Sequence, residues 1–232
     1  MPFIAYYAIG MLFMGLVVFL VGRKFYDFPI WKCICIAVLL TLAGYVGAKL
    51  MGLIETGTFD SRSYFGAVLF APVLMFPVAK LLHVNVNDLF DVCAPCGCIM
   101  QSFLKINCYQ AGCCKGRVLR TVIDSSGGLH EIRFPSQLVE CGASLVLFFI
   151  LLVIIKRGKS RGAVCPWFMV LYGVIRSILN LGRETHPFVW RLPAGNFWAL
   201  ITITIGTIWL CMIRKKNVKK MRIKKQKQHK KM

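Results

Sequence analysis

Seven long apolar runs most restrict what this chain can fold into. The chain has 232 residues, of which 57% are hydrophobic and only 16% are charged, a balance that excludes an ordinary soluble domain. Each run approaches ~20 residues, which is enough for a helix to cross a bilayer core of roughly 30 Å. We therefore predict an all-α polytopic membrane protein with about seven transmembrane helices. Their expected limits are 3–22, 30–53, 64–82, 88–104, 137–155, 163–182 and 194–213.

Positive charge is gathered at the C-terminal end of the chain. Residues 214–232 hold 11 Lys and Arg and no acid, within a net charge of +20. Because basic segments favour the cytoplasmic side, we predict a cytoplasmic C-terminus and, with seven spans, an N-terminus outside. The chain then divides into a transmembrane domain, 1–213, and a basic cytoplasmic tail, 214–232. The tail fits attraction to anionic lipid, at about 1 kcal/mol per cation near the surface, better than nucleic-acid binding.

The stretch from Asp91 to Arg117 begins like a membrane helix and ends in polar residues. This polar end combines amides, glycines, cysteines and cations: Lys105, Asn107, Gln110, Gly112, Cys113, Cys114, Lys115, Gly116 and Arg117. In the predicted topology, it lies outside with the following loop, on the side where basic residues are disfavoured. We interpret it as a site for a polar or anionic ligand at the depth of lipid headgroups.

Most of the 11 cysteines lie within the apolar runs, where we expect them to pack as small apolar side chains. Cys93, Cys96 and Cys98 resemble metal-ligand spacing. However, no nearby histidine or further cysteine pair completes a closed zinc site, so we expect no metal. Cys108 and the pair Cys113–Cys114 fall at the outer end of the fourth run, where a disulfide and free thiols are both compatible with the sequence.

The sixth run carries a polar stripe at helical spacing, formed by Arg176, Asn180 and Arg183. Two guanidiniums on one face match the geometry of a phosphate, which favours an anion site. Pairing of Arg176 with an acid such as Glu140 is the structural alternative. Gln137 and Glu140 lie one turn apart at the start of the fifth run, either as cap residues or as part of the same site.

Three further positions are open to two interpretations each. Lys49, near the outer end of the second run, either extends to the membrane interface or belongs to the site. Residues 129–134 form either a short strand or a surface segment, after a predicted turn at 124–128. Ser136 is a candidate N-cap of the fifth helix.

Six short motifs occur in an order that resembles a known family. They are Gly47–Leu50 (GAKL), Arg62–Ala67 (RSYFGA), Asp91–Pro95 (DVCAP), Lys105–Arg117, Phe134–Glu140 (FPSQLVE) and Tyr172–Arg183. Together they resemble the prolipoprotein diacylglyceryl transferases, which are seven-helix enzymes of the bacterial inner membrane. The resemblance covers most of the chain.

The resemblance implies a reaction. Phosphatidylglycerol would donate its diacylglyceryl group to the lipobox cysteine thiol of a preprolipoprotein and release glycerol phosphate. It implies a multi-pass inner-membrane protein with no metal or organic cofactor and no nucleic-acid partner. The catalytic residues implied are Arg176, Lys105 and Arg183. The lipid- or phosphate-binding residues implied are Lys49, Tyr64, Gly66, Gly112, Gly116, Arg117, Gln137, Glu140 and Asn180.

The chain departs from the family pattern at four positions. Phe65 stands in place of a histidine, Lys105 of an arginine, Asn180 of an acid and Cys108 of an asparagine. An alternative function is therefore a catalytically degenerate member that binds anionic lipid or a lipoprotein precursor without turnover. A small transporter or channel is a third hypothesis, which would require a charged path through several spans.

Overall fold

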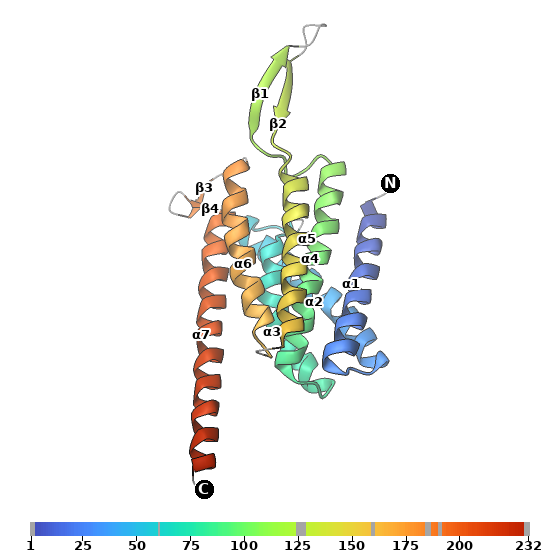
Figure 1. Ribbon diagram of the computed structural model, residues 1–232. Coiled ribbons are helices and arrows are strands. Elements are labelled where there is room, and N and C mark those ends of the chain that lie inside the picture. Colours follow the sequence, from blue (N-terminus) through green and yellow to red (C-terminus); the bar gives the residue numbers. More distant parts are fainter. Residues whose placement is uncertain are drawn as a thin grey trace.

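Seven helices form most of the computed structural model, which describes residues 3–59, 61–123, 129–158, 161–183, 187–189 and 192–229 (Figure 1). All seven are long and apolar enough to cross a membrane, which confirms the predicted polytopic all-α class. Their bounds are α1 Phe3–Tyr26, α2 Ile30–Thr56, α3 Tyr64–Leu81, α4 Val86–Gln110, α5 Ser136–Arg157, α6 Val164–Leu179 and α7 Ala194–His229. A 3-10 turn, η1, follows α6 at Asn180–Gly182.

Helix α4 lies at the centre of the bundle. It packs against α1, α3, α5 and α6, and 67% of its span is buried in protein, against 17–44% for the other six spans. Polar side chains such as Asp91, Gln101 and Lys105 are therefore buried against protein instead of facing lipid. This explains how the least hydrophobic of the seven spans can lie within the membrane, where a polar group facing lipid would be costly.

Helices α4 and α7 extend furthest beyond the ends that the sequence predicts. Helix α4 continues six residues beyond the expected end at 104, because Lys105 and Asn107 are buried against neighbouring helices and do not have to leave the membrane. Helix α7 continues beyond residue 213 to His229 without a break. The basic tail is rich in lysine, a good helix former, so the end of the apolar run does not end the helix.

A β-hairpin projects from the end of the bundle between α4 and α5 (Figure 1). Strand β1, Val118–Ile123, pairs antiparallel with β2, Leu129–Arg133, so the segment 129–134 is mainly a strand. The predicted turn at 124–128 lies outside the described residues. A shorter pair, β3 Pro187–Val189 and β4 Leu192–Pro193, precedes α7. The hairpin and the N-terminal end lie at one end of the bundle and the C-terminus at the other, while the membrane side of each stays a prediction.

Helices α2 and α3 approach each other through two glycines. A Cβ atom added at Gly66 would overlap the carbonyl oxygen of Gly47, and a Cβ added at Gly47 would overlap that of Gly66. Small residues allow this close backbone contact in lipid, where the hydrophobic effect does not drive helices together. The structure therefore gives Gly66 a packing role, whereas the resemblance implied lipid binding.

Asp91 fixes the start of α6 against α4. Its carboxylate accepts hydrogen bonds from the backbone N–H groups of Gly162, at 2.6 Å, and Val164, at 2.9 Å. The Tyr26 hydroxyl donates a third, at 3.2 Å. The first N–H groups of a helix have no partner within the helix, so a buried acceptor there holds the helix end in place. Asp91 thereby sets the position of α6 and of the arginines at its far end.

Candidate anion site

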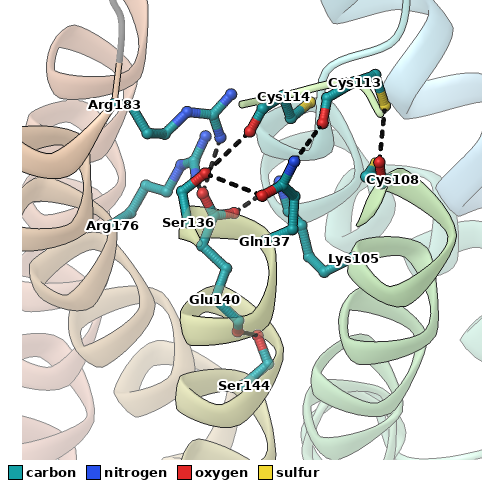
Figure 2. A network of polar contacts seen from close by, with 10 residues as sticks. All are labelled: Lys105, Cys108, Cys113, Cys114, Ser136, Gln137, Glu140, Ser144, Arg176 and Arg183. Atoms are coloured by element: carbon teal, nitrogen blue, oxygen red, sulfur yellow. Dashed lines mark hydrogen bonds and ion pairs between the residues drawn. The ribbon is translucent and has the colours of Figure 1, made fainter. Parts of the chain in front are cut away.

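Glu140 is the centre of a cluster of three cations drawn from different elements (Figure 2). Its carboxylate lies 2.6 Å from Lys105 Nζ on α4, 2.5 Å from Arg176 Nη1 on α6, and 2.8 Å from Arg183 Nη1 after η1. The Glu140 side chain is 3% exposed, and those of the three cations are 9–15% exposed. The structure therefore brings together all three predicted catalytic residues around a buried acid.

One carboxylate does not balance three cations. Three cations face one carboxylate in a largely buried place, and the Cys114 thiol, whose pKa is lowered beside Arg183, offsets one more positive charge. At least one positive charge remains in excess, and an unbalanced buried ion costs several kcal/mol. Arg176 contacts Glu140 without hydrogen-bond geometry, and its buried Nε and Nη1 atoms donate to no acceptor among the described residues. Donors and charge are thus left over for an anionic ligand. The pairing of Arg176 with Glu140, the structural alternative raised above, is present and leaves this capacity in place.

A cavity of about 600 Å³ opens beside the cluster. Lys105, Arg176 and Arg183 line one part of it. Apolar side chains line most of the rest, among them Val68 and Met75 of α3. An enclosure that is mainly apolar, with a few polar groups gathered in one place, is typical of a small-molecule binding site. Its two regions match an amphipathic ligand that has an anionic headgroup.

The loop after α4 covers the cationic part of the site and is tied to the start of α5. Ser136 Oγ donates to the Cys114 carbonyl oxygen at 2.9 Å, and Gln137 Nε2 donates to that of Cys113 at 2.7 Å. The prediction that Ser136 caps α5 is wrong. The N-cap is Pro135, which makes no side-chain cap bond, and the Ser136 hydroxyl is directed to the loop instead.

Two groups beside the membrane spans have shifted acidities. Hydrogen bonding to the Cys108 thiol lowers the pKa of the Cys114 thiol, with help from the charges of Lys105 and Arg183 and against the effect of burial. Burial lowers the pKa of Arg183, but the nearby Glu140 carboxylate more than offsets this, so the pKa lies above its usual value. Neighbouring charges at this end of the cavity contribute to both shifts.

Other predicted site residues lie near the cavity or hold its surroundings together. Tyr64 lines the cavity and donates its hydroxyl to the Gly97 carbonyl at 2.5 Å. Gly112 has a φ of 65°, which turns the chain at the end of α4. A Cβ at Gly116 would overlap the backbone of Phe134. Both glycines thus meet backbone requirements of the loop and need no ligand to explain them.

Three predicted residues have their side chains away from the cavity. Lys49 donates to the Phe59 carbonyl in the loop after α2. Asn180 donates to Asn196 Oδ1 at 2.6 Å and so links η1 to α7. The Arg117 side chain is exposed, while its backbone N–H donates to Gly182. The cavity wall formed by the described residues includes none of the three.

Two charged residues that line the cavity, Glu55 and Arg62, were not among the predicted site residues. Glu55 and Arg62 flank the loop between α2 and α3, where no periodicity shows which way a side chain points. The spacing of Cys108 and Cys114 was visible, but their place on the cavity depends on how the loop after α4 turns. Phe65, the departure from the family histidine, lies with its ring centre 6.0 Å from the Arg176 guanidinium.

The fold and the site define an integral membrane protein with a mainly apolar cavity of about 600 Å³ that is cationic in one region. By sequence, the chain belongs to the prolipoprotein diacylglyceryl transferase family, whose model matches residues 3–212.

Individual relatives support this membership. The chain is similar to the phosphatidylglycerol–prolipoprotein diacylglyceryl transferase of Clostridium tetani, with 27% identity over 61% of this chain and 60% of the relative. The enzyme of the same name from Dehalococcoides mccartyi strain 195 is 23% identical over 73% of this chain and 72% of the relative. The enzyme of the same name from Teredinibacter turnerae is 29% identical over 63% of this chain and 54% of the relative. The chain thus spans between about half and three quarters of the length of these relatives.

Proposed function

We propose that this protein transfers the diacylglyceryl group of phosphatidylglycerol to the lipobox cysteine thiol of a preprolipoprotein. Family membership supports the reaction class, because the relatives carry that activity in their names. The observation that carries the proposal is the cation cluster of Lys105, Arg176 and Arg183, which has one carboxylate for three cations and lines a mainly apolar cavity.

The cavity suits the lipid donor in both of its regions. A diacylglyceryl group is apolar over most of its length and would lie along the α3 and α4 walls. The phosphate would lie beside Arg176 and Arg183, whose planar guanidiniums can each donate two hydrogen bonds to its oxygens. The unused Nε donor of Arg176 is available for this purpose.

The chemistry is an S-alkylation. The electron pair of the substrate thiolate forms a bond to the terminal glyceryl carbon, the bond between that carbon and the phosphate oxygen breaks, and glycerol phosphate leaves with that bond's electrons. The phosphate gains negative charge as the bond breaks, so cations placed beforehand at that position lower the barrier. In this scheme Arg176 and Arg183 stabilise the leaving group, while Lys105 adds charge and holds Glu140 in place.

The thiol proton requires an acceptor, because only the thiolate is nucleophilic enough to react. Phe65 cannot accept it. The Lys105 side chain is already engaged by the Glu140 carboxylate, 2.6 Å from its Nζ atom. Of the two candidate acceptors, Lys105 and the substrate phosphate, we therefore favour the phosphate.

The proposed setting is the bacterial inner membrane, with the site at the outer surface. The cation cluster lies near the end of the bundle that carries the β-hairpin, away from the basic C-terminus (Figures 1 and 2). With the tail in the cytoplasm, the site would face the leaflet in which exported precursors present their lipobox cysteine. The protein partners proposed are therefore preprolipoprotein signal peptides.

A non-catalytic binding role is the second candidate, favoured by Phe65 and Asn180. Phe65 places a ring that cannot transfer protons against Arg176, and Asn180 pairs with Asn196 rather than supplying an acid to the cluster. Such a protein would bind the anionic lipid at the same cations and would not turn it over.

One experiment separates the two candidates. The chain is expressed in a bacterium depleted of its own transferase, and a reporter lipoprotein is analysed by mass spectrometry. We expect growth to be restored and the reporter to gain a diacylglyceryl mass on its lipobox cysteine. An unmodified reporter, despite good membrane expression of the chain, would refute the enzyme and leave the binding role.

A further inference from the structure

Three cysteine thiols converge at the edge of the cavity. The Sγ atoms of Cys108, at the end of α4, and of Cys113 and Cys114, in the following loop, all lie within 4.8 Å of one another. Within the part of the chain that the structure describes, no other three His, Cys, Asp or Glu side chains converge in this way. Cys93, Cys96 and Cys98, whose spacing resembles a metal motif, do not form such a group.

The backbone is arranged to hold this geometry. Gly112, with a φ of 65°, turns the chain back toward α4, and Cys114 adopts a φ of 55°. A left-handed conformation costs a non-glycine residue roughly 1–2 kcal/mol, so the surrounding contacts must enforce it. Ser136 and Gln137 do so by binding the carbonyl oxygens of Cys114 and Cys113, respectively (Figure 2). The Cys113 thiol also lies 3.6 Å from the Cys108 carbonyl oxygen.

The electrostatic surroundings suit bound thiolates. Three thiolates around a divalent cation carry one excess negative charge. Lys105 and Arg183 line the same region of the cavity as Cys108 and Cys114, and the cation cluster has positive charge to spare. Zinc prefers thiolate ligands in a tetrahedral arrangement, and catalytic zinc sites use three protein ligands with an open fourth position.

We propose that Cys108, Cys113 and Cys114 bind Zn²⁺ and that the substrate cysteine thiol occupies the fourth position. Cys108 and Cys114 line the cavity, so the open position would face the proposed lipid donor. The sequence contains no closed set of four zinc ligands, so it predicts no metal, whereas the fold supplies three ligands beside a cavity. The proposal rests on the transferase function and deepens it.

Zinc would supply the thiol activation that the residue at position 65 cannot. A thiol that coordinates Zn²⁺ is deprotonated, and its proton passes to solvent as the metal binds. The thiolate electron pair then forms the bond to the terminal glyceryl carbon, and the carbon–oxygen bond breaks. Its electrons leave with glycerol phosphate, held by Arg176 and Arg183. Zinc remains divalent throughout, so the step needs no oxidant or reductant.

The first test measures metal content. Full-length protein is purified in detergent with a reductant, loaded with Zn²⁺ alone, and dialysed before elemental analysis. We expect about one zinc per chain, lost in Cys108→Ser and Cys114→Ser. Cys211→Ser, which changes an exposed cysteine on α7, is the matched control and should keep its zinc. Protein that binds no zinc when its thiols are reduced would overturn the proposal. The same holds if the purified protein contains a Cys108–Cys114 disulfide and still binds no zinc after that disulfide has been reduced.

The second test examines the fourth position without any transfer reaction. Co²⁺ replaces Zn²⁺, and its thiolate charge-transfer absorption is followed while a lipobox peptide is added in the absence of lipid. The cysteine peptide should change the spectrum, and the same peptide with serine should leave it unchanged. Identical spectra with both peptides would refute substrate coordination.

The metal test and the function test can fail separately. Transferase activity that survives chelation of all zinc would refute the zinc inference and leave the proposed function standing. A zinc-loaded, peptide-binding protein that never modifies a reporter would refute the transferase and support the metal site.

Discussion

Two buried carboxylates, those of Asp91 and Glu140, differ in the charge of the groups around them and therefore in their role. Asp91 accepts two backbone N–H groups and a tyrosine hydroxyl, all of them neutral donors from the protein itself. Glu140 is surrounded by three cations, which carry more charge than it can neutralise. A buried acid whose donors are neutral and satisfied holds the fold together. An acid outnumbered by cations marks a place where a further anion can bind.

The largest effect should follow from removing the charge of Glu140. Glu140→Gln keeps the shape but leaves three partly buried cations without their shared carboxylate. Breaking a buried ion pair from one side costs about 3–5 kcal/mol, so we expect a markedly lower Tm in detergent. Adding inorganic phosphate should raise the Tm of this variant more than that of the wild type. Equal effects of phosphate on both proteins would contradict the excess-charge interpretation.

Arg176→Ala should chiefly affect the reaction. Loss of one group that stabilises developing charge costs about 10²–10³-fold in rate, so reporter lipidation should nearly disappear. The variant should still fold, because Lys105 and Arg183 continue to pair with Glu140. Arg157→Ala, at the exposed end of α5, is the control. Normal lipidation by Arg176→Ala would show that the phosphate is bound elsewhere.

Asp91→Asn should destabilise the protein, and inorganic phosphate should not restore its Tm as it does for Glu140→Gln. An amide can replace only one of the two acceptor oxygens that receive Gly162 and Val164, so one helix N–H group loses its partner. Such a loss costs about 1–3 kcal/mol. The Tm should fall, and inorganic phosphate should leave it unchanged. A rise in the Tm of Asp91→Asn on adding phosphate would contradict the distinction between the two carboxylates.

Lys49→Ala should have the smallest effect. Its side-chain amine donates a solvent-exposed hydrogen bond to a loop carbonyl outside the cavity. A hydrogen bond of this kind contributes about 0.5–1.5 kcal/mol, so a small fall in Tm and normal reporter lipidation are expected. A large loss of lipidation at normal stability would instead place Lys49 in the site, as the family resemblance implied.

The fold was largely predictable from the sequence because lipid imposes a simple rule. An apolar run long enough to cross the bilayer becomes a helix, so all seven helices were expected. Their ends were less predictable, because burial against protein decides where a polar residue such as Lys105 can lie. Arg176 and Arg183 both reach Glu140, but Arg183 does so from extended backbone after η1 and not from the face of α6 that helical spacing predicts.

Sequence spacing can relate site residues to one another only when they lie on the same helix or strand. Glu140, Lys105 and Arg183 come from three different elements, and their ion pairs form only because the helices pack in this arrangement. Asn180 fitted the arginine stripe by spacing but turns to Asn196, because a polar partner on α7 is within reach. The convergence of the three thiols depends on left-handed backbone at Gly112 and Cys114, which local sequence does not specify.

The unbroken α7 helix has a consequence for how the C-terminal charge acts. Its apolar span ends at Lys216, and the helix continues for another 13 residues to His229. At ~1.5 Å per residue, this extension is about 20 Å long. Electrostatic attraction to a membrane fades within about 8 Å at physiological ionic strength. If the helix leaves the bilayer along its axis, its outer turns would lie beyond the reach of lipid charge, so that only its first turns would act as an anchor.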